Sequence, residues 1–447
     1  DAVVHDKNLR DAQIGIAIVD VDSGRLLAGH EEHLALNPAS NAKVYTAAAA
    51  LATLHADHRF VTTLSGTLKG GVVQGGLVLR GQGDPSLKSD DLWALAQELK
   101  AHGVKRVDGD ILVDQRFFDG ETTPPAFDQR PNEWAYFRAP VSAVALNENT
   151  VTMTVRPGAE GSPAHVTFDP PGFVDVEGTV TTSEAGSDSV VLALSPSGRR
   201  LSAKVSGAIA ASSRLVRYTR RVEDPQLLAG YALKAILAEV GVSVSGEPKL
   251  GSKDKATVLA RHESAPLSDI LLPVGKNSDN FYAEMIFKTL GGEGKGRPGK
   301  SADGAEVVTK LLEKNGLLEQ GVSIKNGSGL YDANRVTAKG TADLLRWAWR
   351  EPGVGPEFVS QLAIGGVDGT LHRRFVPLRS TRAVRAKTGT LDDVIALSGY
   401  VMGPPGKGPI AFSIFFNRVS GKGNAARVAA DGLVTKIHKE HWAGASR

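Results

Sequence analysis

Three short motifs, far apart along the chain, place serine, lysine and asparagine side chains at close spacing. They are Ser40-Asn41-Ala42-Lys43, Ser278-Asp279-Asn280 and Lys387-Thr388-Gly389, in this order along 447 residues. A serine hydroxyl is a poor nucleophile until a base removes its proton, and a lysine can be that base when burial or a nearby cation lowers its pKa. The motifs therefore contain the parts of a serine acyl-transfer site with a lysine base.

The first motif precedes a run that is typical of a buried helix. Residues 44–51 are mostly strong helix formers and carry no charge. Positions i and i+3 share one helix face, so the Lys43 amine can reach the Ser40 hydroxyl, and the N–H groups at the helix start favour a developing oxyanion. The alternative is that Ser40 only caps the helix. A second Ser-x-x-Lys spacing, at Ser252 and Lys255, lies in a charged loop and indicates a chance match.

The second motif offers a hydroxyl and an amide at alternate positions. If the loop is extended there, Ser278 and Asn280 point into one cleft. A hydroxyl suits proton relay toward a leaving amine, and an amide side chain can both donate to and accept from a peptide. The alternative is a polar helix entry in which Ser278 or Asp279 is the N-cap.

The third motif ends a predicted strand over residues 383–386. A strand edge that carries Lys387, the hydroxyls of Thr388 and Thr390, and Gly389 offers backbone groups for an extended peptide, a cation for a carboxylate and room for close approach. Lys387 is also a candidate for the cation that lowers the pKa of Lys43. The alternative is an ordinary exposed hairpin.

The two ends of the chain show similar patterns and could share one sheet. Strands are expected at both ends and a helix closes the chain, whereas the middle contains short β-like runs separated by glycine and one helical stretch. The strands are expected at residues 14–20, 26–30, 383–387, 394–401 and 409–416, and helices at 89–102, from 225 onward and at 423–438.

This change of sequence pattern between the ends and the middle of the chain predicts a discontinuous catalytic domain that is interrupted by accessory β-rich modules. The catalytic domain is expected at residues 1–60 and 217–447. A first accessory domain is expected at 61–150 and about 200–216, and a second, nested and β-rich, at 151–200.

The composition excludes several classes of function. The chain is 41% hydrophobic and 23% charged with a net charge of +3, and it has no basic stripe, so nucleic acid is not an expected partner. It has no cysteine, and none of its 11 histidines forms a ligand cluster, so no metal or other cofactor is expected. No apolar run approaches the roughly 18–20 residues of a transmembrane anchor. A start at Asp1 is typical of a chain exported to the periplasm or the extracellular space.

The three motifs in this order resemble those of the penicillin-recognising serine peptidases and β-lactamases. Further stretches are similar to the D-alanyl-D-alanine carboxypeptidase/endopeptidase branch, the low-molecular-mass class C penicillin-binding proteins. The resemblance implies an α+β fold in which a β-lactamase/transpeptidase-like domain, an antiparallel sheet with helices, is interrupted after the first motif by two inserted domains. The further stretches are residues 81–87, 107–110, 139–143, 326–330, 334–336 and 366–371.

The resemblance also implies an activity and site roles. It implies a serine D,D-peptidase that acts on peptidoglycan stem peptides as a carboxypeptidase, an endopeptidase or both, and that β-lactam antibiotics acylate. It implies that Ser40 is the nucleophile, Lys43 its base and Ser278 a proton relay to the leaving group. It implies that Asn280 contacts the acyl-side amide and that Lys387 sets the electrostatics of the site. Thr388 and Thr390, on the strand that contains Gly389, would bind the substrate carboxylate, and the N–H groups of Ser40 and Thr390 would form the oxyanion hole.

Two alternatives belong to other classes. A β-lactamase shares the acylation machinery, but the chain has no Glu-x-x-Leu-Asn stretch to activate a deacylating water, and the large insertion argues against a compact β-lactamase. A non-catalytic cell-wall peptide-binding protein would not need three intact motifs. The sequence leaves the oligomeric state open.

Overall fold

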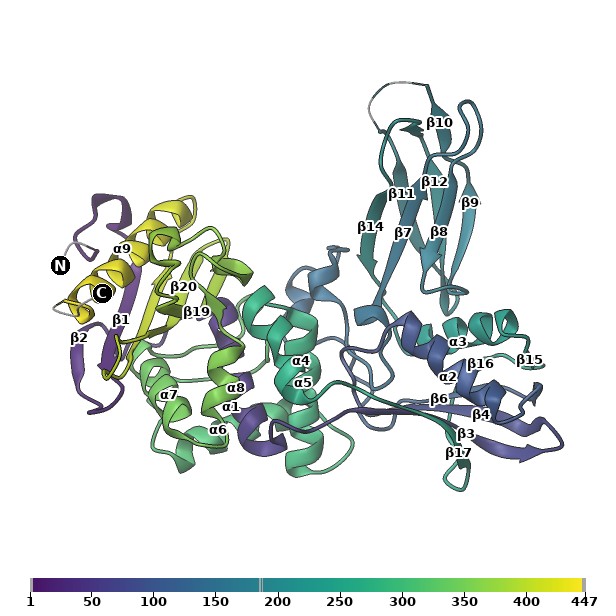
Figure 1. The fold of residues 1–447 in the computed structure, drawn as a ribbon, viewed down its shortest axis with the longest axis horizontal. Helices are drawn as coiled ribbons and strands as arrows, with labels where there is room; N and C mark the ends of the chain where they lie inside the picture. Colours follow the sequence, from purple (N-terminus) through teal and green to yellow (C-terminus); the bar gives the residue numbers. More distant parts are fainter. Residues whose placement is uncertain (1–2, 185, 187, 444–447) are drawn as a thin grey trace. The chain divides into compact units, whose positions relative to one another are not determined.

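The computed structural model describes residues 3–184, 186 and 188–443, which divide into two compact units. Unit 1 comprises Asp1–Arg59, Pro124–Pro131 and Ala265–Arg447, and unit 2 comprises Phe60–Thr123 and Asn132–Ser264. Unit 1 is therefore discontinuous, and the interruption follows the first motif. Figure 1 shows the elements of both units.

Unit 1 is built on one antiparallel sheet to which both ends of the chain contribute (Figure 1). Its strand order is β18-β19-β20-β21-β1-β2, so the N-terminal strand β1 pairs with β21. The two chain ends thus share a sheet, as the sequence suggested. The strands are β1 (Gln13–Asp20), β2 (Leu26–His30), β18 (Ala363–Ile364), β19 (Val384–Leu391), β20 (Val394–Val401) and β21 (Ile410–Asn417).

Helices cover both faces of this sheet because its central strands are apolar on both sides. Every residue of β20 and β21 is buried, and alternate residues of each strand face opposite layers. Leu397 packs in the cluster under α9, whereas the Tyr400 hydroxyl donates to the Leu345 carbonyl of α7. The helices are α1 (Ala42–Leu54), α4 (Leu267–Leu272), α5 (Asn280–Lys295), α6 (Ser301–Lys314), α7 (Ala338–Arg350), α8 (Gly355–Ser360) and α9 (Gly423–His441).

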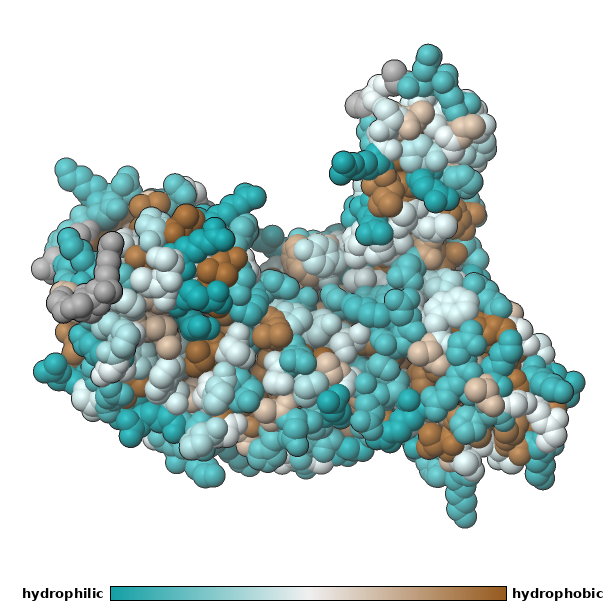
Figure 2. All heavy atoms as spheres, in the orientation of Figure 1, coloured by the Kyte–Doolittle hydropathy of each residue, from teal (hydrophilic) through white to brown (hydrophobic). Residues whose placement is uncertain are grey.

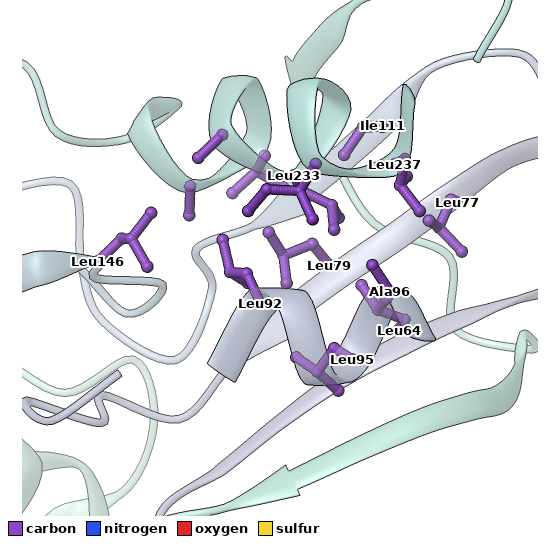
Figure 3. Packing of buried hydrophobic residues seen from close by; sticks show 14 of the residues in the cluster. Leu64, Leu77, Leu79, Leu92, Leu95, Ala96, Ile111, Leu146, Leu233 and Leu237 are labelled. Atoms are coloured by element: carbon purple, nitrogen blue, oxygen red, sulfur yellow. The ribbon is translucent and has the colours of Figure 1, made fainter. Parts of the chain in front are cut away.

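Unit 2 contains a mixed sheet packed against two helices. Leu92 of α2 and Leu233 of α3 meet Leu79 of β4 in its core (Figure 3). Residues 106–114 form two strands instead of one, because the backbone turns at Gly109, whose φ is +125°. The elements are β3 (Val61–Lys69), β4 (Val72–Gly81), α2 (Ser89–Ala101), β5 (Arg106–Asp108), β6 (Ile111–Asp114), α3 (Leu228–Glu239), β15 (Ser243–Val244), β16 (Pro248–Leu250) and β17 (Thr257–Glu263).

The rest of unit 2 is a β-rich segment with a small core of its own, formed by Met153, Val155, Val180, Val205 and Ile209. Three small sheets have the orders β14-β7-β8, β11-β12-β9 and β10-β13. The strands are β7 (Thr150–Arg156), β8 (His165–Asp169), β9 (Val174–Gly178), β10 (Thr181–Ser183), β11 (Val191–Ser197), β12 (Arg200–Ser206), β13 (Ala208–Ala210) and β14 (Val216–Arg221).

The units divide the chain at positions that differ from the sequence-based boundaries. Residues 217–264, expected in the catalytic domain, lie in unit 2, because β14 pairs with β7 and β17 pairs with β3. The β-rich segment also runs to Arg221 instead of ending near residue 200.

Hydrophobic residues form small separate groups among hydrophilic ones on the face of the molecule drawn in Figure 2. Among the helices in the described part of the chain, none has both the length and the apolar character that crossing a membrane requires.

We predict that Leu79→Ala lowers the local free energy of unfolding of unit 2 by about 2–5 kcal/mol, because the Leu79 side chain is fully buried and its removal leaves a cavity. Hydrogen exchange of peptides from β3 and β4 measures this value. Leu250→Ala is the matched control, since Leu250 lies on β16 and is 43% exposed, and it should change the value by less than about 0.5 kcal/mol. Equal effects of the two substitutions would contradict the assignment of this core.

Candidate active site

Ser40 lies in a tight turn that continues into α1. The turn is a 3-10 segment, Ala39–Asn41, and Ala39 has a φ of +45°, which is uncommon for a residue with a side chain. The Asn37 side chain holds the turn, since its Oδ1 accepts from the Ala39 N–H at 2.9 Å. Asn417, at the end of β21, in turn accepts from the Asn37 N–H at 2.9 Å. The central sheet thus fixes the backbone that presents the Ser40 hydroxyl.

Lys43, one turn into the same helical stretch, is buried and 1% exposed. Its Nζ lies 3.0 Å from Ser40 Oγ, 2.7 Å from Asn280 Oδ1 and 2.7 Å from the carbonyl oxygen of Ser328. Burial lowers the pKa of the Lys43 amine to about 7, although the nearby carboxyl groups of Glu284 and Asp279 act in the opposite direction. The amine is therefore held against the hydroxyl, and near neutral pH its charged and neutral forms are both well populated.

The second motif does not form the extended loop that the sequence analysis considered. A five-residue π-helical turn, Pro273–Asn277, leads to Ser278 in the left-handed conformation, with φ 64° and ψ 35°. Asp279 is the N-cap of α5, as one alternative predicted, and accepts from the Tyr282 N–H. The turn still brings Ser278 and Asn280 to the two lysines, because Asn280 is the first residue of α5.

Lys387 is the second buried lysine of the cluster and is also 1% exposed. Its Nζ lies 2.8 Å from Ser278 Oγ and 2.7 Å from the Thr388 carbonyl oxygen. Burial and the positive charge of Lys43 lower the pKa of Lys387 well below its ordinary value. Repulsion between two ammonium groups is mutual, so the closeness of Lys387 to Lys43 disfavours charging both amines at once.

Gly389 allows β19 to lie against the Ser40 turn. A Cβ at this position would lie 2.8 Å from the Pro38 carbonyl oxygen, which is too close for any side chain. Thr390 is exposed, and the Thr388 hydroxyl donates to Thr370 Oγ1 at 2.9 Å. Three residues of the third motif therefore line one short stretch of strand beside Ser40.

The same stretch is an open sheet edge in the described residues. Strand β18 has two residues, and it pairs only with Arg385 and Ala386 of β19. From Lys387 to Leu391, the side of β19 that faces away from β20 has no strand partner in the described chain. An extended peptide could pair there through its backbone.

Three residues of this cluster were not identified from the sequence. Ser328 and Thr370 lie in stretches that carried the family resemblance, but their residue types alone did not indicate the contacts that they make. Glu284 is buried and accepts hydrogen bonds from the Gly327 and Ser328 N–H groups. Its position four residues after Asn280, on the same helix face, was the signal that could have identified it.

No group of three or more His, Cys, Asp or Glu side chains within residues 3–184, 186 and 188–443 is arranged to hold a metal ion. Ser252 belongs to unit 2, whereas Ser40, Ser278 and Lys387 all belong to unit 1.

Comparison with known proteins gives consistent matches over nearly the whole chain. The model of the D-Ala-D-Ala carboxypeptidase 3 (S13) family matches residues 1–437. A D-alanyl-D-alanine carboxypeptidase of Actinomadura sp. (strain R39) is 37% identical over 440 residues, which cover 94% of this chain and 80% of that protein.

Solved structures match over a similar extent. Penicillin-binding protein 4 of Haemophilus influenzae superposes with a TM-score of 0.80 at 25% identity, covering 98% of both chains, and that protein has also been solved in complex with a β-lactam. The peptidoglycan endopeptidase Bd3459 of Bdellovibrio bacteriovorus has a TM-score of 0.57 at 15% identity, covering 96% of this chain and 94% of its own, and shares the fold. The predicted α+β, β-lactamase/transpeptidase-like fold with inserted β-rich domains is confirmed.

We predict that Gly329→Ala destabilises the protein by more than about 3 kcal/mol. Gly329 has a φ of +74°, and a Cβ there would lie 1.8 Å from the Ala39 carbonyl oxygen, inside the Ser40 turn. The matched control is Gly316→Ala, since Gly316 has a φ of +65° but open space around its Cβ position, and it should cost only about 1–2 kcal/mol of backbone strain. Urea denaturation measures both, and equal losses would show that the close approach to Ala39 does not matter.

Proposed function

Since the chain belongs to the D-Ala-D-Ala carboxypeptidase 3 (S13) family and is a serine D,D-peptidase, we propose that Ser40 is its nucleophile and Lys43 the base. The observation that carries this assignment is the distance of 3.0 Å between Lys43 Nζ and Ser40 Oγ in a buried setting. The substrate class we propose is the peptidoglycan stem peptide that ends in D-Ala.

The partners of Lys43 determine where its lone pair points. A neutral amine has two N–H groups and one lone pair. The side-chain oxygen of Asn280 and the carbonyl of Ser328 can only accept hydrogen bonds, so they take both N–H groups of a neutral Lys43. The lone pair is then left for the third neighbour, the Ser40 hydroxyl, which can donate its proton.

The proposed reaction proceeds in two halves. Ser40 Oγ attacks the carbonyl carbon of the penultimate D-Ala as Lys43 takes the hydroxyl proton, and the C–N bond then breaks as a proton passes to the leaving amine. Ser278 is placed for that transfer, because its hydroxyl lies 2.8 Å from the Lys387 amine. A water molecule then attacks the Ser40 ester, with Lys43 again as the base, and the acid product leaves.

The substrate carboxylate gives Lys387 a role in the proposal. An anion beside Lys387, Thr388 and Thr390 would favour the charged form of Lys387, and a charged Lys387 would in turn favour the neutral form of Lys43. Substrate binding at the open edge of β19 would thus help to generate the base. The N–H groups of Ser40 and Thr390 would bind the oxyanion, because Gly389 lets β19 approach the Ser40 turn.

A β-lactam presents a strained amide and a carboxylate in a similar arrangement, so we propose that β-lactam antibiotics acylate Ser40. The substrate class also carries a proposed location, because peptidoglycan lies outside the cytoplasmic membrane. We therefore place the site of action in the periplasm or the extracellular space.

The proposed function is tested by incubating the protein with purified muropeptides and resolving the products by mass. Loss of one terminal D-Ala identifies carboxypeptidase action, and division of a cross-linked dimer identifies endopeptidase action. A labelled penicillin should modify Ser40 alone, and Ser40→Ala should abolish both labelling and hydrolysis. Label on another serine, or hydrolysis by Ser40→Ala, would overturn the assignment.

We predict that the rate of acylation by penicillin rises with pH through a pKa of about 7, since the attack requires neutral Lys43 and burial sets its pKa at that value. Below that pH, the rate should fall about tenfold per pH unit. Lys43→Arg should be nearly as inactive as Lys43→Ala, because a guanidinium keeps its charge but cannot give up its proton. Stopped-flow measurement of the acylation rate from about pH 5 to about pH 9 gives the rate profile of each protein. Substantial activity of the Arg variant would show that charge alone suffices.

A further inference from the structure

Glu284 is a buried carboxyl group for which the proposed reaction has no direct use. It lies on α5, one helical turn after Asn280, and is 1% exposed. Its Oε1 accepts from the Ser328 N–H at 2.8 Å and its Oε2 accepts from the Gly327 N–H at 3.2 Å. A buried carboxyl group is costly unless such donors compensate for the lost water, so this placement needs a reason.

The backbone segment that Glu284 holds is the one that contacts the base. The carbonyl of Ser328 lies 2.7 Å from Lys43 Nζ, and the carbonyl of Gly327 accepts from the Thr46 hydroxyl of α1 at 2.8 Å. The N–H side of this segment is thus fixed to α5 and its carbonyl side to α1. The attachment to α5 holds the same peptide whose carbonyl contacts the Lys43 amine.

We propose that Glu284 is a positioning residue for the acylation step: it anchors the N–H groups of residues 327 and 328 so that the Ser328 carbonyl takes one N–H of Lys43 and directs its lone pair at Ser40. This inference rests on the proposed roles of Ser40 and Lys43. Glu284 does not touch the substrate, and it acts through the Ser328 peptide.

In its ionised form, Glu284 gives this role a signature that a purely structural role lacks. Burial raises the pKa of this carboxyl group, but the hydrogen bonds from Ser328 and Gly327 and the charge of Lys43 act in the opposite direction. Three charged groups face the Lys43 amine: Glu284 within α5, Asp279 at the N-cap of α5, and Lys387 on β19. The two carboxyl groups raise the pKa of Lys43 against the effect of burial. Replacing Glu284 with a neutral residue should therefore lower the pKa of Lys43, so the acidic limb of the rate profile moves to lower pH even as the rate falls.

The test compares acylation by a fluorescent penicillin in the full-length wild type, Glu284→Gln and Thr46→Val over a range of pH. Glu284→Gln should lower the maximal acylation rate constant by on the order of 10²-fold, the usual effect of misplacing a catalytic group by about 1 Å, and should shift the acidic limb to lower pH. Thr46→Val loosens the same segment from its other side without changing charge, so it should lower the rate but leave the acidic limb in place.

A Glu284→Gln rate within about twofold of the wild type, or an equal shift of the limb in Thr46→Val, would overturn the proposal. If Glu284→Gln does not fold, Glu284→Asp serves as the test, because it keeps the charge but shortens the side chain. The acylation rate should then fall while the acidic limb of the pH profile stays in place. An unaltered rate would overturn the positioning role. Failure of the proposed function is distinguishable, because the wild type itself would then not be acylated at Ser40.

Discussion

The burial of two lysine side chains in one small volume is the constraint around which unit 1 is built. Lys43 and Lys387 are each 1% exposed, and burial lowers the pKa of both. An isolated buried cation is strongly unfavourable, and two are worse. The structure surrounds the amines with hydroxyl, amide and carbonyl oxygens, which stabilise them in either charge state. The result is a pair of amines that both lose their protons more readily than an ordinary lysine.

Holding these oxygens in place requires backbone conformations that ordinary sequences avoid. Ala39 and Ser278 have positive φ angles, and Gly329 fits against the Ala39 carbonyl only because it lacks a side chain. Such conformations persist only where the surrounding structure enforces them. Here the enforcing groups are the Asn37 bond to the end of β21 and the close contact of Gly275 with the Gln361 backbone. The stability of the central sheet and helices therefore maintains the strained geometry of the site.

Local patterns in the sequence singled out residues that the structure brings together, namely Ser40, Lys43, Ser278, Asn280 and Lys387, and they predicted most elements. Features set by distant contacts were not predictable. The strand at residues 394–401 and the helix from Ser89 followed from periodicity. The left-handed conformation of Ser278 depends on packing around the preceding π-helical turn, so an extended loop was an equally reasonable interpretation. The helix Leu228–Glu239 has the same apolar periodicity whichever unit it joins. Its packing against α2 and β4, together with the pairing of β14 with β7 and of β17 with β3, places it in unit 2.

The open edge of β19 is short in the described chain. An unpaired strand edge can recruit another chain, and proteins usually block it. Strand β18 covers the edge only at Arg385 and Ala386, and the remaining stretch is five residues long, from Lys387 to Leu391. Its first side chain is a buried lysine that donates to Ser278 Oγ, and Thr390 leaves a polar side chain exposed. A neutral or hydrophobic strand would gain little from so short an edge, whereas the proposed substrate, an extended peptide that ends in a carboxylate, would gain both backbone pairing and an interaction with Lys387. Under the proposed function, the short edge and its buried lysine would therefore favour this ligand over association with another strand.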